Sequence, residues 1–129
     1  INSTAVHVFN FGSKTPTGEL DTIMGTAYYA DGDTGGKLTL NLGGFPAGTY
    51  WVLDIGPLNE DGLYSWSIVS DSSGETLFVL ARDVAEYKLM YEDEVNAELE
   101  DLGFTTAATA PQPVYQPPTC TYPPMPPAL

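Results

Sequence analysis

The stretch Gly48–Asp83, GTYWVLDIGPLNEDGLYSWSIVSDSSGETLFVLARD, decides the fold. Three short runs rich in aromatic and branched residues, at 50–55, 64–70 and 76–82, are separated by clusters of Gly, Pro, Asn, Asp and Ser. Such runs, bounded by turn-forming residues, are typical of β-strands. Both tryptophans of the chain, Trp51 and Trp66, lie within these runs. The stretch therefore predicts a meander of three antiparallel strands.

Three more runs before this stretch predict further strands, at 5–12, 20–29 and 37–42. The run at 37–42 alternates strictly, with a leucine at every second position, which is typical of a strand with one buried face. Gly25 lies in the middle of the run at 20–29 and predicts a bend, a bulge or a close approach of neighbouring backbone. The chain thus begins with a second group of three strands.

After the stretch, the hydrophobic period changes to that of a helix, over residues 83–102. Asp83 is the predicted N-cap, with Glu86 at the spacing of a capping box. Gly103 is the predicted residue that ends the helix, and Phe104 is available for the hydrophobic contact that follows. One face of this helix is apolar and the other acidic. The apolar residues are Val84, Tyr87, Tyr91, Val95, Leu99 and Leu102.

Residues 105–129 hold most of the chain's 11 prolines and show no hydrophobic period. We therefore expect two parts, a folded region at 1–104 and a Pro-rich extended tail at 105–129. The tail is either a loose terminus or a strap that lies along another protein.

The charge is strongly negative, with 17 acidic residues, 4 basic residues and a net charge of −13. Nucleic acids and anionic membrane surfaces would repel such a chain, so we expect neither as a partner. No apolar run reaches the roughly 18 residues that a membrane span needs, so we expect no transmembrane segment. The sequence starts at Ile1 without a leader, and we interpret this as removal of a targeting segment, hence an extracytoplasmic location (secreted or in an organelle lumen).

Residues for catalysis or for binding a metal are few. His7 is the only histidine, so a histidine metal cluster is impossible, and we expect no metal site. The turn at 30–36 has the acid spacing of a calcium loop, but Leu42 stands where an EF-hand needs a glutamate, so a hairpin turn is the better interpretation. No arrangement of residues marks a nucleophile. We expect no enzymatic activity.

The residues Tyr50–Asp54, Tyr64–Asp71 and Leu77–Arg82, followed by a helix that ends in Gly-Phe, occur in an order that resembles the lipocalins. The likeness is greatest to the bacterial outer-membrane and apolipoprotein-D-like branch, and it covers about residues 5–104. It implies a mainly β fold: an antiparallel up-and-down β-barrel plus a C-terminal α-helix and the Pro-rich tail.

The resemblance also implies a non-catalytic binding or transport protein for a small hydrophobic ligand, such as a carotenoid, bilin, retinoid or fatty acid. Retinoids, carotenoids and bilins are pigments, and fatty acids are lipids. The residues that we expect to line the ligand cup are Met24, Leu40, Trp51, Leu53, Trp66, Ile68 and Phe78.

The chain departs from the family pattern in three ways. The Gly-x-Trp motif of the first strand is absent, and no room remains for the first strands of the barrel. In the family, the arginine at the position of Arg82 packs over that tryptophan and closes the barrel base. Cys120 lies about where apolipoprotein-D-like members tie the C-terminal region to an earlier cysteine, but the partner region near Asn10 has none.

A second polypeptide would supply all three missing features, so we expect a two-chain barrel (a heterodimer) with Arg82 at its closure and Cys120 as a candidate for an intermolecular disulfide. Asn2 begins an N-glycosylation triplet, which is relevant only on a secretory route. The alternative is a structural or assembly subunit of a larger complex, with no ligand of its own.

Overall fold

The structure, a computed structural model, describes residues 5–15, 18–30, 32, 34–43, 45–117, 120 and 122. It consists of two compact units, Ile1–Thr49 with Val114–Leu129, and Tyr50–Pro113. The strands are β1 (Ala5–Gly12), β2 (Asp21–Tyr28), β3 (Lys37–Leu42), β4 (Gly48–Ile55), β5 (Trp66–Ser70) and β6 (Leu77–Ala81). The helices are α1 (Val84–Met90) and α2 (Glu92–Asp101). The predicted class, mainly β with helical structure near the C-terminus, is confirmed, and within each unit neighbouring strands pair antiparallel.

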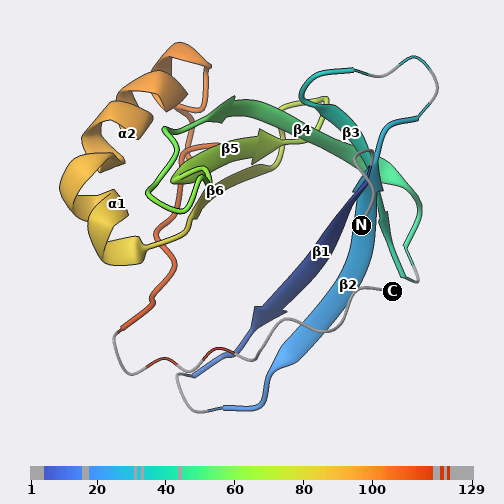
Figure 1. Ribbon diagram of the computed structural model, residues 1–129, viewed down its shortest axis with the longest axis horizontal. Coiled ribbons are helices and arrows are strands. Elements are labelled where there is room, and N and C mark those ends of the chain that lie inside the picture. The colour runs from blue at the N-terminus through green and yellow to red at the C-terminus, as the bar shows by residue number, and fades with distance from the viewer. Residues whose placement is uncertain are drawn as a thin grey trace. The chain divides into compact units, whose positions relative to one another are not determined.

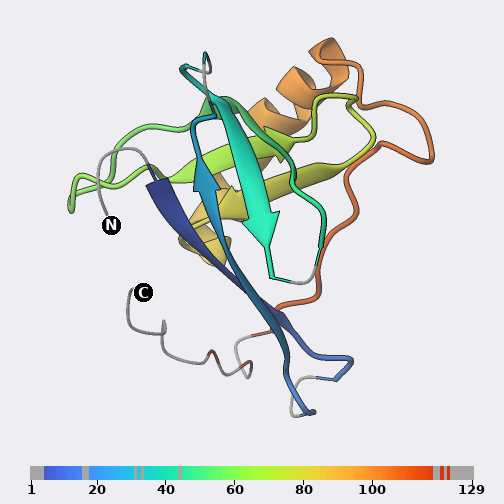
Figure 2. The ribbon, with the colours of Figure 1, turned by 90° about the vertical axis from the view of Figure 1, so that its right-hand side faces the viewer.

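In the first unit, β1, β2 and β3 lie side by side, as Figure 2 shows. Gly25 pairs with Val8 on one side and with Leu42 on the other, without any shift of register. A Cβ atom at Gly25 would overlap the backbone oxygen of Asn41. Of the three expectations for this glycine, close approach of neighbouring backbone is therefore correct.

The connection from β2 to β3 contains two glycines in the left-handed region, Gly32 with φ 86° and Gly35 with φ 66°. L-residues with a side chain adopt these angles at a steric cost, so glycine is favoured at both positions. The hairpin turn predicted at 30–36 is therefore confirmed at its glycines. Asp31 and Asp33, the acids of the calcium-like spacing, lie outside the described residues.

In the second unit, β4, β5 and β6 form a three-stranded antiparallel ladder, and α1 and α2 follow β6 (Figure 1). The register of β4 against β5 shifts between Val52 and Asp54, which marks a bulge at Leu53. Asp71 shapes the turn from β5 to β6, since its Oδ1 accepts hydrogen bonds from the backbone N–H groups of Glu75 (3.0 Å) and Thr76 (3.4 Å). Such a side chain supplies acceptors to the N–H groups that the tight turn leaves free.

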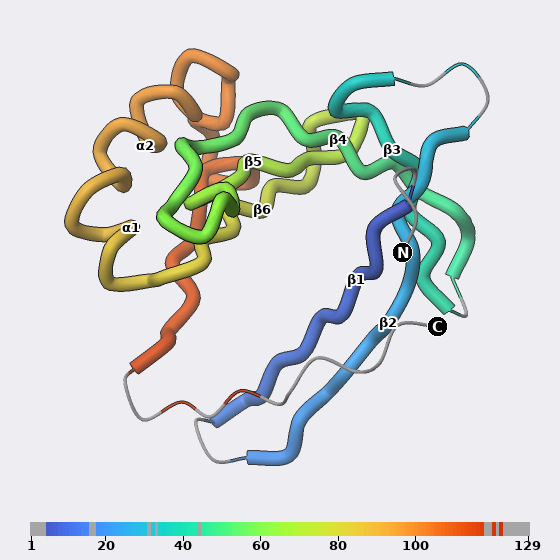
Figure 3. The backbone as a smooth tube through the Cα atoms, viewed as in Figure 1, coloured from blue at the N-terminus to red at the C-terminus, as the bar shows by residue number. Residues whose placement is uncertain are grey.

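The helical region is two helices rather than the single helix predicted over 83–102 (Figure 3). The start is as predicted, because Asp83 Oδ1 accepts from the N–H of Glu86 at 3.0 Å. The break is at Tyr91, whose φ of −125° leaves the helical region. Tyr91 and Tyr87 both pack against the buried cluster, so the break leaves both aromatic rings on the sheet side. Leu102 is wrong as a member of the apolar face, because its side chain is exposed.

The helix end is as predicted. Gly103 adopts φ 95°, its N–H donates to the carbonyl of Glu100 at 3.0 Å, and the N–H of Phe104 donates to the carbonyl of Leu99 at 3.0 Å. These two bonds define a Schellman motif, in which the residue after the glycine packs back onto the last turn. Phe104 does so, because it is buried in the same cluster as Leu99.

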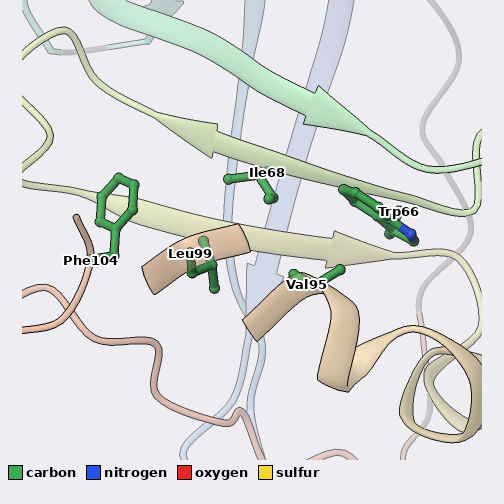
Figure 4. Close-up of a cluster of buried hydrophobic side chains, with 5 residues drawn as sticks. All are labelled: Trp66, Ile68, Val95, Leu99 and Phe104. Atoms are coloured by element: carbon green, nitrogen blue, oxygen red, sulfur yellow. The ribbon is translucent and has the colours of Figure 1, made fainter. Parts of the chain in front are cut away.

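The core of the second unit lies between the ladder and α2 (Figure 4). It contains Trp66 and Ile68 from β5, Val95 and Leu99 from α2, and Phe104. Ile68 and Val95 are fully buried, and the spacing of Val95 and Leu99 puts both on one side of the helix. This burial, rather than the helix propensity of ten residues, stabilises α2. None of the helices described here has the length and the apolar character that crossing a membrane requires.

Candidate functional site

The β4–β6 ladder has two faces, which the strand register assigns. Residues paired across strands point to the same side of a sheet. One side, the helix face, carries the core. It comprises Trp51, Asp54, Trp66, Ile68, Ser70, Leu77, Val79 and Ala81. The other side, the open face, comprises Val52, Ile55, Ser67, Val69, Phe78 and Leu80. Five of these six open-face residues are apolar.

Three large apolar side chains on the open face are strongly exposed. The exposed fractions are 59% for Phe78, 46% for Leu80 and 41% for Ile55. Leu53, the extra residue of the bulge, has no partner on β5 and is 38% exposed, and the register assigns it to neither face. Val69, in the middle of the same face, is only 3% exposed, so the exposed group is Ile55, Phe78 and Leu80. Exposed apolar residues are ordinary when scattered singly, but several on one sheet face favour a surface that binds something apolar.

The register separates the residues predicted to line a cup. Trp66 and Ile68 lie on the helix face within the core, and Trp51 lies on the same face, while Phe78 lies on the open face. A single cup cannot be lined by residues from both faces of one ladder. The reason lies in α2, which buries the side of β5 that holds Trp66 and Ile68. Of the predicted residues on this ladder, Phe78 is the one that the register places on the open face.

In the first unit, the predicted residues Met24 and Leu40 also lie on opposite faces. Met24 pairs with Phe9, and its side chain is 46% exposed. Leu40 is partly buried and pairs with Ala27, which pairs in turn with Val6. Ala27 lies three residues after Met24 on β2, so Leu40 and Met24 point to opposite faces. Whether either residue contacts a ligand stays a prediction.

Sequence reasoning missed Ile55 and Leu80. Alternation along β6 places Leu80 beside Phe78, so the sequence contained the signal for Leu80. Strict alternation along β4 would separate Ile55 from Val52, and only the bulge at Leu53 brings both to the open face. Nothing in the local sequence marks that bulge.

Arg82, the predicted barrel-closing residue, lies at the end of β6. Its Nε donates to the carbonyl of Tyr64 at 2.8 Å, and its backbone N–H donates to the carbonyl of Ser65 at 3.1 Å. Its guanidinium is thus fixed to the backbone just before β5. The role of Arg82 in stacking on an aromatic residue of a second chain stays a prediction.

The indole N–H of Trp66 lies near the same end and has no hydrogen-bond partner among the described residues, although Trp66 is only 4% exposed. The indole ring packs directly against Gly56, where a Cβ atom would lie 2.5 Å from Cδ1 and 2.7 Å from Cε2. A buried donor without an acceptor is costly. Because the ring packs so closely against the backbone of residue 56, only glycine fits there.

A pair of carboxyl groups joins β4 to α2. A hydrogen bond between the side chains of Asp54 and Glu98, together with partial burial and the nearby charges of Asp54, Glu94 and Asp101, raises the pKa of Glu98 to about 7. Two carboxyl groups in contact share one proton more easily than they both ionise. Asp54 can participate because the bulge turns it toward the helix face, opposite Ile68.

Three other titrating groups are shifted for local reasons. Burial raises the pKa of the Tyr50 hydroxyl. Burial and, secondarily, the charge of Glu92 raise the pKa of Tyr87. The hydrogen bond from Ser73, aided by the backbone donors of the turn, lowers the pKa of Asp71. Tyr87 and Asp71 lie outside the open face, whereas Tyr50 precedes Trp51 on β4 and so lies on the same side as Val52.

The described residues contain no group of three His, Cys, Asp or Glu side chains that could hold a metal ion. Cys120 has a free, partly buried thiol, and its backbone N–H donates to the carbonyl of Pro117. An intermolecular disulfide at Cys120 stays a prediction. Tyr122 contacts Phe11 of β1 edge to face, with ring centroids 6.1 Å apart, so part of the tail packs on the first unit. Asn2 lies outside the described residues.

Three comparisons with known proteins complete these observations. The family model described as a lipocalin-like domain matches residues 1–113. Comparison with curated proteins found no match, and comparison with solved structures found none. The matched region includes all six strands and both helices, together with the open face. The chain belongs to the lipocalin-like domain family.

Proposed function

We propose that the chain is a non-catalytic binding protein that holds a small hydrophobic ligand against the open face of β4–β6. The observation that carries this proposal is the exposure of Ile55, Phe78 and Leu80 together on one sheet face. Burying such side chains against a ligand is favourable by about 25 cal/mol per Å² of apolar area removed from water. The lipocalin-like family match supports a small ligand as the occupant.

The ligand class is a carotenoid, a bilin, a retinoid or a fatty acid. Ser67 is the only polar residue among the six paired residues of the open face, so contacts with a ligand there are mostly apolar. An absorption spectrum of protein isolated from its natural source separates the three pigment classes from fatty acids, which do not absorb visible light. We also propose an extracytoplasmic location for the protein.

The binding test uses retinol as a fluorescent probe, with palmitate and biliverdin as competitors, on the full chain. The double substitution Phe78→Ser with Leu80→Ser shortens two exposed side chains, so the fold is retained. Losing their apolar contacts raises the Kd of retinol by about tenfold or more, since each buried side chain of this size contributes about 1.5–3 kcal/mol. Leu89→Ser is the matched control, because Leu89 lies on α1 and is 86% exposed.

Unchanged retinol affinity in the double variant, or an equal loss in the Leu89→Ser control, contradicts the proposed site. Failure of retinol, palmitate and biliverdin all to bind contradicts the proposed ligand class.

We also propose that a second polypeptide completes the barrel. Size-exclusion chromatography of the natively isolated protein, followed by identification of whatever co-elutes, tests this part. A monodisperse monomer with full β signal by circular dichroism contradicts it.

The alternative function, a subunit of an assembly without a ligand, is favoured by one observation. Helix α2 has acidic residues in its first turn, Glu92, Asp93 and Glu94, and no basic residue in its last turn, so it presents negative charge to a partner. A stable natural complex in which the open face excludes retinol would favour this alternative.

A further inference from the structure

The segment 111–117, Pro-Gln-Pro-Val-Tyr-Gln-Pro, has no regular secondary structure. None of the described residues forms a backbone hydrogen bond with residues 111–116. Three prolines in seven positions explain this, because proline has no N–H group and holds φ near −65°. The residue before each proline is also directed to extended angles. Local physics therefore favours a polyproline II helix over this segment.

One edge of that helix is entirely apolar. A polyproline II helix has three residues per turn, so every third residue lies along one edge. Pro111, Val114 and Pro117 have this spacing, and Tyr115 begins the edge beside them. The side chains remain in water, since Val114 is 71% exposed and Tyr115 is 78% exposed. Neighbouring apolar side chains that the fold leaves uncovered favour a contact with a partner.

The residues that follow restrain the end of the segment. The backbone N–H of Cys120 donates to the carbonyl of Pro117 at 2.9 Å, so the chain turns after the segment. The hydroxyl of Tyr122 donates to Oε1 of Gln116 at 3.3 Å, and its ring contacts that of Phe11 on β1. Restraint before binding reduces the entropy that is lost when a partner orders the segment.

The distribution of charge narrows the kind of partner. Residues 105–129 contain no charged side chain and no histidine, so the net charge of −13 lies entirely within residues 1–104. The segment therefore offers no cation for a partner's carboxylate, and the acidic remainder of the chain repels carboxylates nearby. A second copy of the chain would add the same −13, so like charges oppose self-association. The contact must come from apolar surface and shape.

We propose that segment 111–117 binds, as a polyproline II helix, in a groove on another protein that is lined by Trp and Tyr side chains and has no carboxylates at its rim. Aromatic-lined grooves accept the apolar edge of such a helix between their rings. Pro111, Val114 and Pro117 fill the groove, and Tyr115 packs beside it. The inference goes beyond the proposed function, because the segment contributes no residue to the open face of β4–β6.

The test is an NMR titration of the isotope-labelled full chain with two purified probes. One probe is a WW domain chosen for an aromatic groove without carboxylates beside it, and the other is an SH3 domain chosen with carboxylates beside its groove. The WW domain shifts the amide signals of Val114, Tyr115 and Gln116, and it leaves the signal of the core residue Leu99 unchanged. The SH3 domain binds about tenfold more weakly or less.

Val114→Ser removes the central apolar side chain of the edge and raises the Kd of the WW domain by about tenfold. Gln112→Ser, in the same segment but off that edge, is the matched control and changes this Kd by less than about twofold. Both variants keep the prolines and alter no core residue, so the fold is retained. Absence of shifts with the WW domain, equally tight binding of the SH3 domain, or equal losses in the two variants overturns the proposal.

Two further readings complete the test. Amide shifts in segment 111–117 that grow with protein concentration in the absence of a probe identify a second copy as the partner and also overturn the proposal. Retinol binding to the same samples separates this inference from the proposed function, because Val114→Ser leaves the open-face side chains in place. Retinol binding without binding of the WW domain refutes only the groove partner. Binding of the WW domain without retinol binding refutes only the ligand.

Discussion

Asp54 of β4 and Glu98 of α2 share a hydrogen bond between their carboxyl groups, which requires a proton on one of them. Glu98 follows Val95 and precedes Leu99, the two buried residues that fix α2 to the sheet. The protonation state of this pair therefore acts on the contact between helix and strand.

The first prediction concerns pH. The pKa of Glu98 rises from its usual 4.5 to about 7 in the folded chain, so the folded state binds more protons than the unfolded state between these values. The free energy of unfolding consequently falls as pH rises from about 4.5 through about 7, and it levels off above that range. Urea unfolding at pH 5, 6, 7 and 8 measures this slope.

Glu98→Gln flattens the slope, because the amide donates to Asp54 at every pH. Glu100→Gln, an exposed position on the same helix, is the matched control and leaves the slope unchanged. The depressed pKa of Asp71 does not interfere, since stability from that group is lost only as pH falls below its usual value of 3.8. Equal slopes in the wild-type chain and Glu98→Gln would show that the pair does not control stability.

Gly56→Ala is predicted to destabilise the second unit. The added Cβ would overlap the buried indole of Trp66, a rigid ring that cannot move aside without disturbing the core. Overpacking of this kind costs about 1–3 kcal/mol of unfolding free energy. Gly48→Ala is the control, since a Cβ atom there meets nothing within 4 Å. Similar losses in both variants, measured by chemical denaturation, would contradict the role assigned to Gly56.

Trp66→Phe tests the unpartnered indole N–H. The smaller ring loses packing, but the change also removes a buried donor whose isolation costs about 1–3 kcal/mol. We expect these effects to offset each other, so that the free energy of unfolding changes by less than about 1.5 kcal/mol. Trp66→Ala, which leaves a cavity, costs about 3–5 kcal/mol. A Phe variant as unstable as the Ala variant would mean that the N–H has a partner.

Leu99→Ala tests the docking of α2. Leu99 is 1% exposed and contributes to the buried cluster, so its truncation costs about 2–5 kcal/mol. Leu89→Ala on α1, at a position 86% exposed, changes stability by no more than about 0.5 kcal/mol. The two midpoints in urea give the comparison, and a small effect at Leu99 would mean that α2 is not held by this cluster.

Local sequence predicted the elements well where local physics is strong. Alternation identified β3 to the residue, Asp83 marked the helix start, and the Gly103–Phe104 pair marked its end. In each case the signal is an interaction between residues close in the chain: a side-chain cap, a left-handed glycine or the period of a strand. The break at Tyr91 escaped prediction, because the apolar period of the helical region continues through it without a Gly or Pro.

The candidate site was predicted less well. Choosing aromatic and branched residues selected Phe78, which lies on the open face, together with Trp66 and Ile68, which lie in the core that α2 covers. Ile55 was missed, because the bulge at Leu53 reverses the alternation of β4. Composition tells that a residue is apolar, but it does not tell which side of the sheet α2 will cover.

The sequence by itself determined the strand-rich class, the order of the elements, the caps of the helical region and the acidic charge, because propensity, period and charge are properties of neighbouring residues. Only the tertiary structure decided which face of β4–β6 is buried and that Asp54 meets Glu98. These features arise where segments far apart in the chain pack together, and packing depends on which surfaces compete for burial rather than on any one segment.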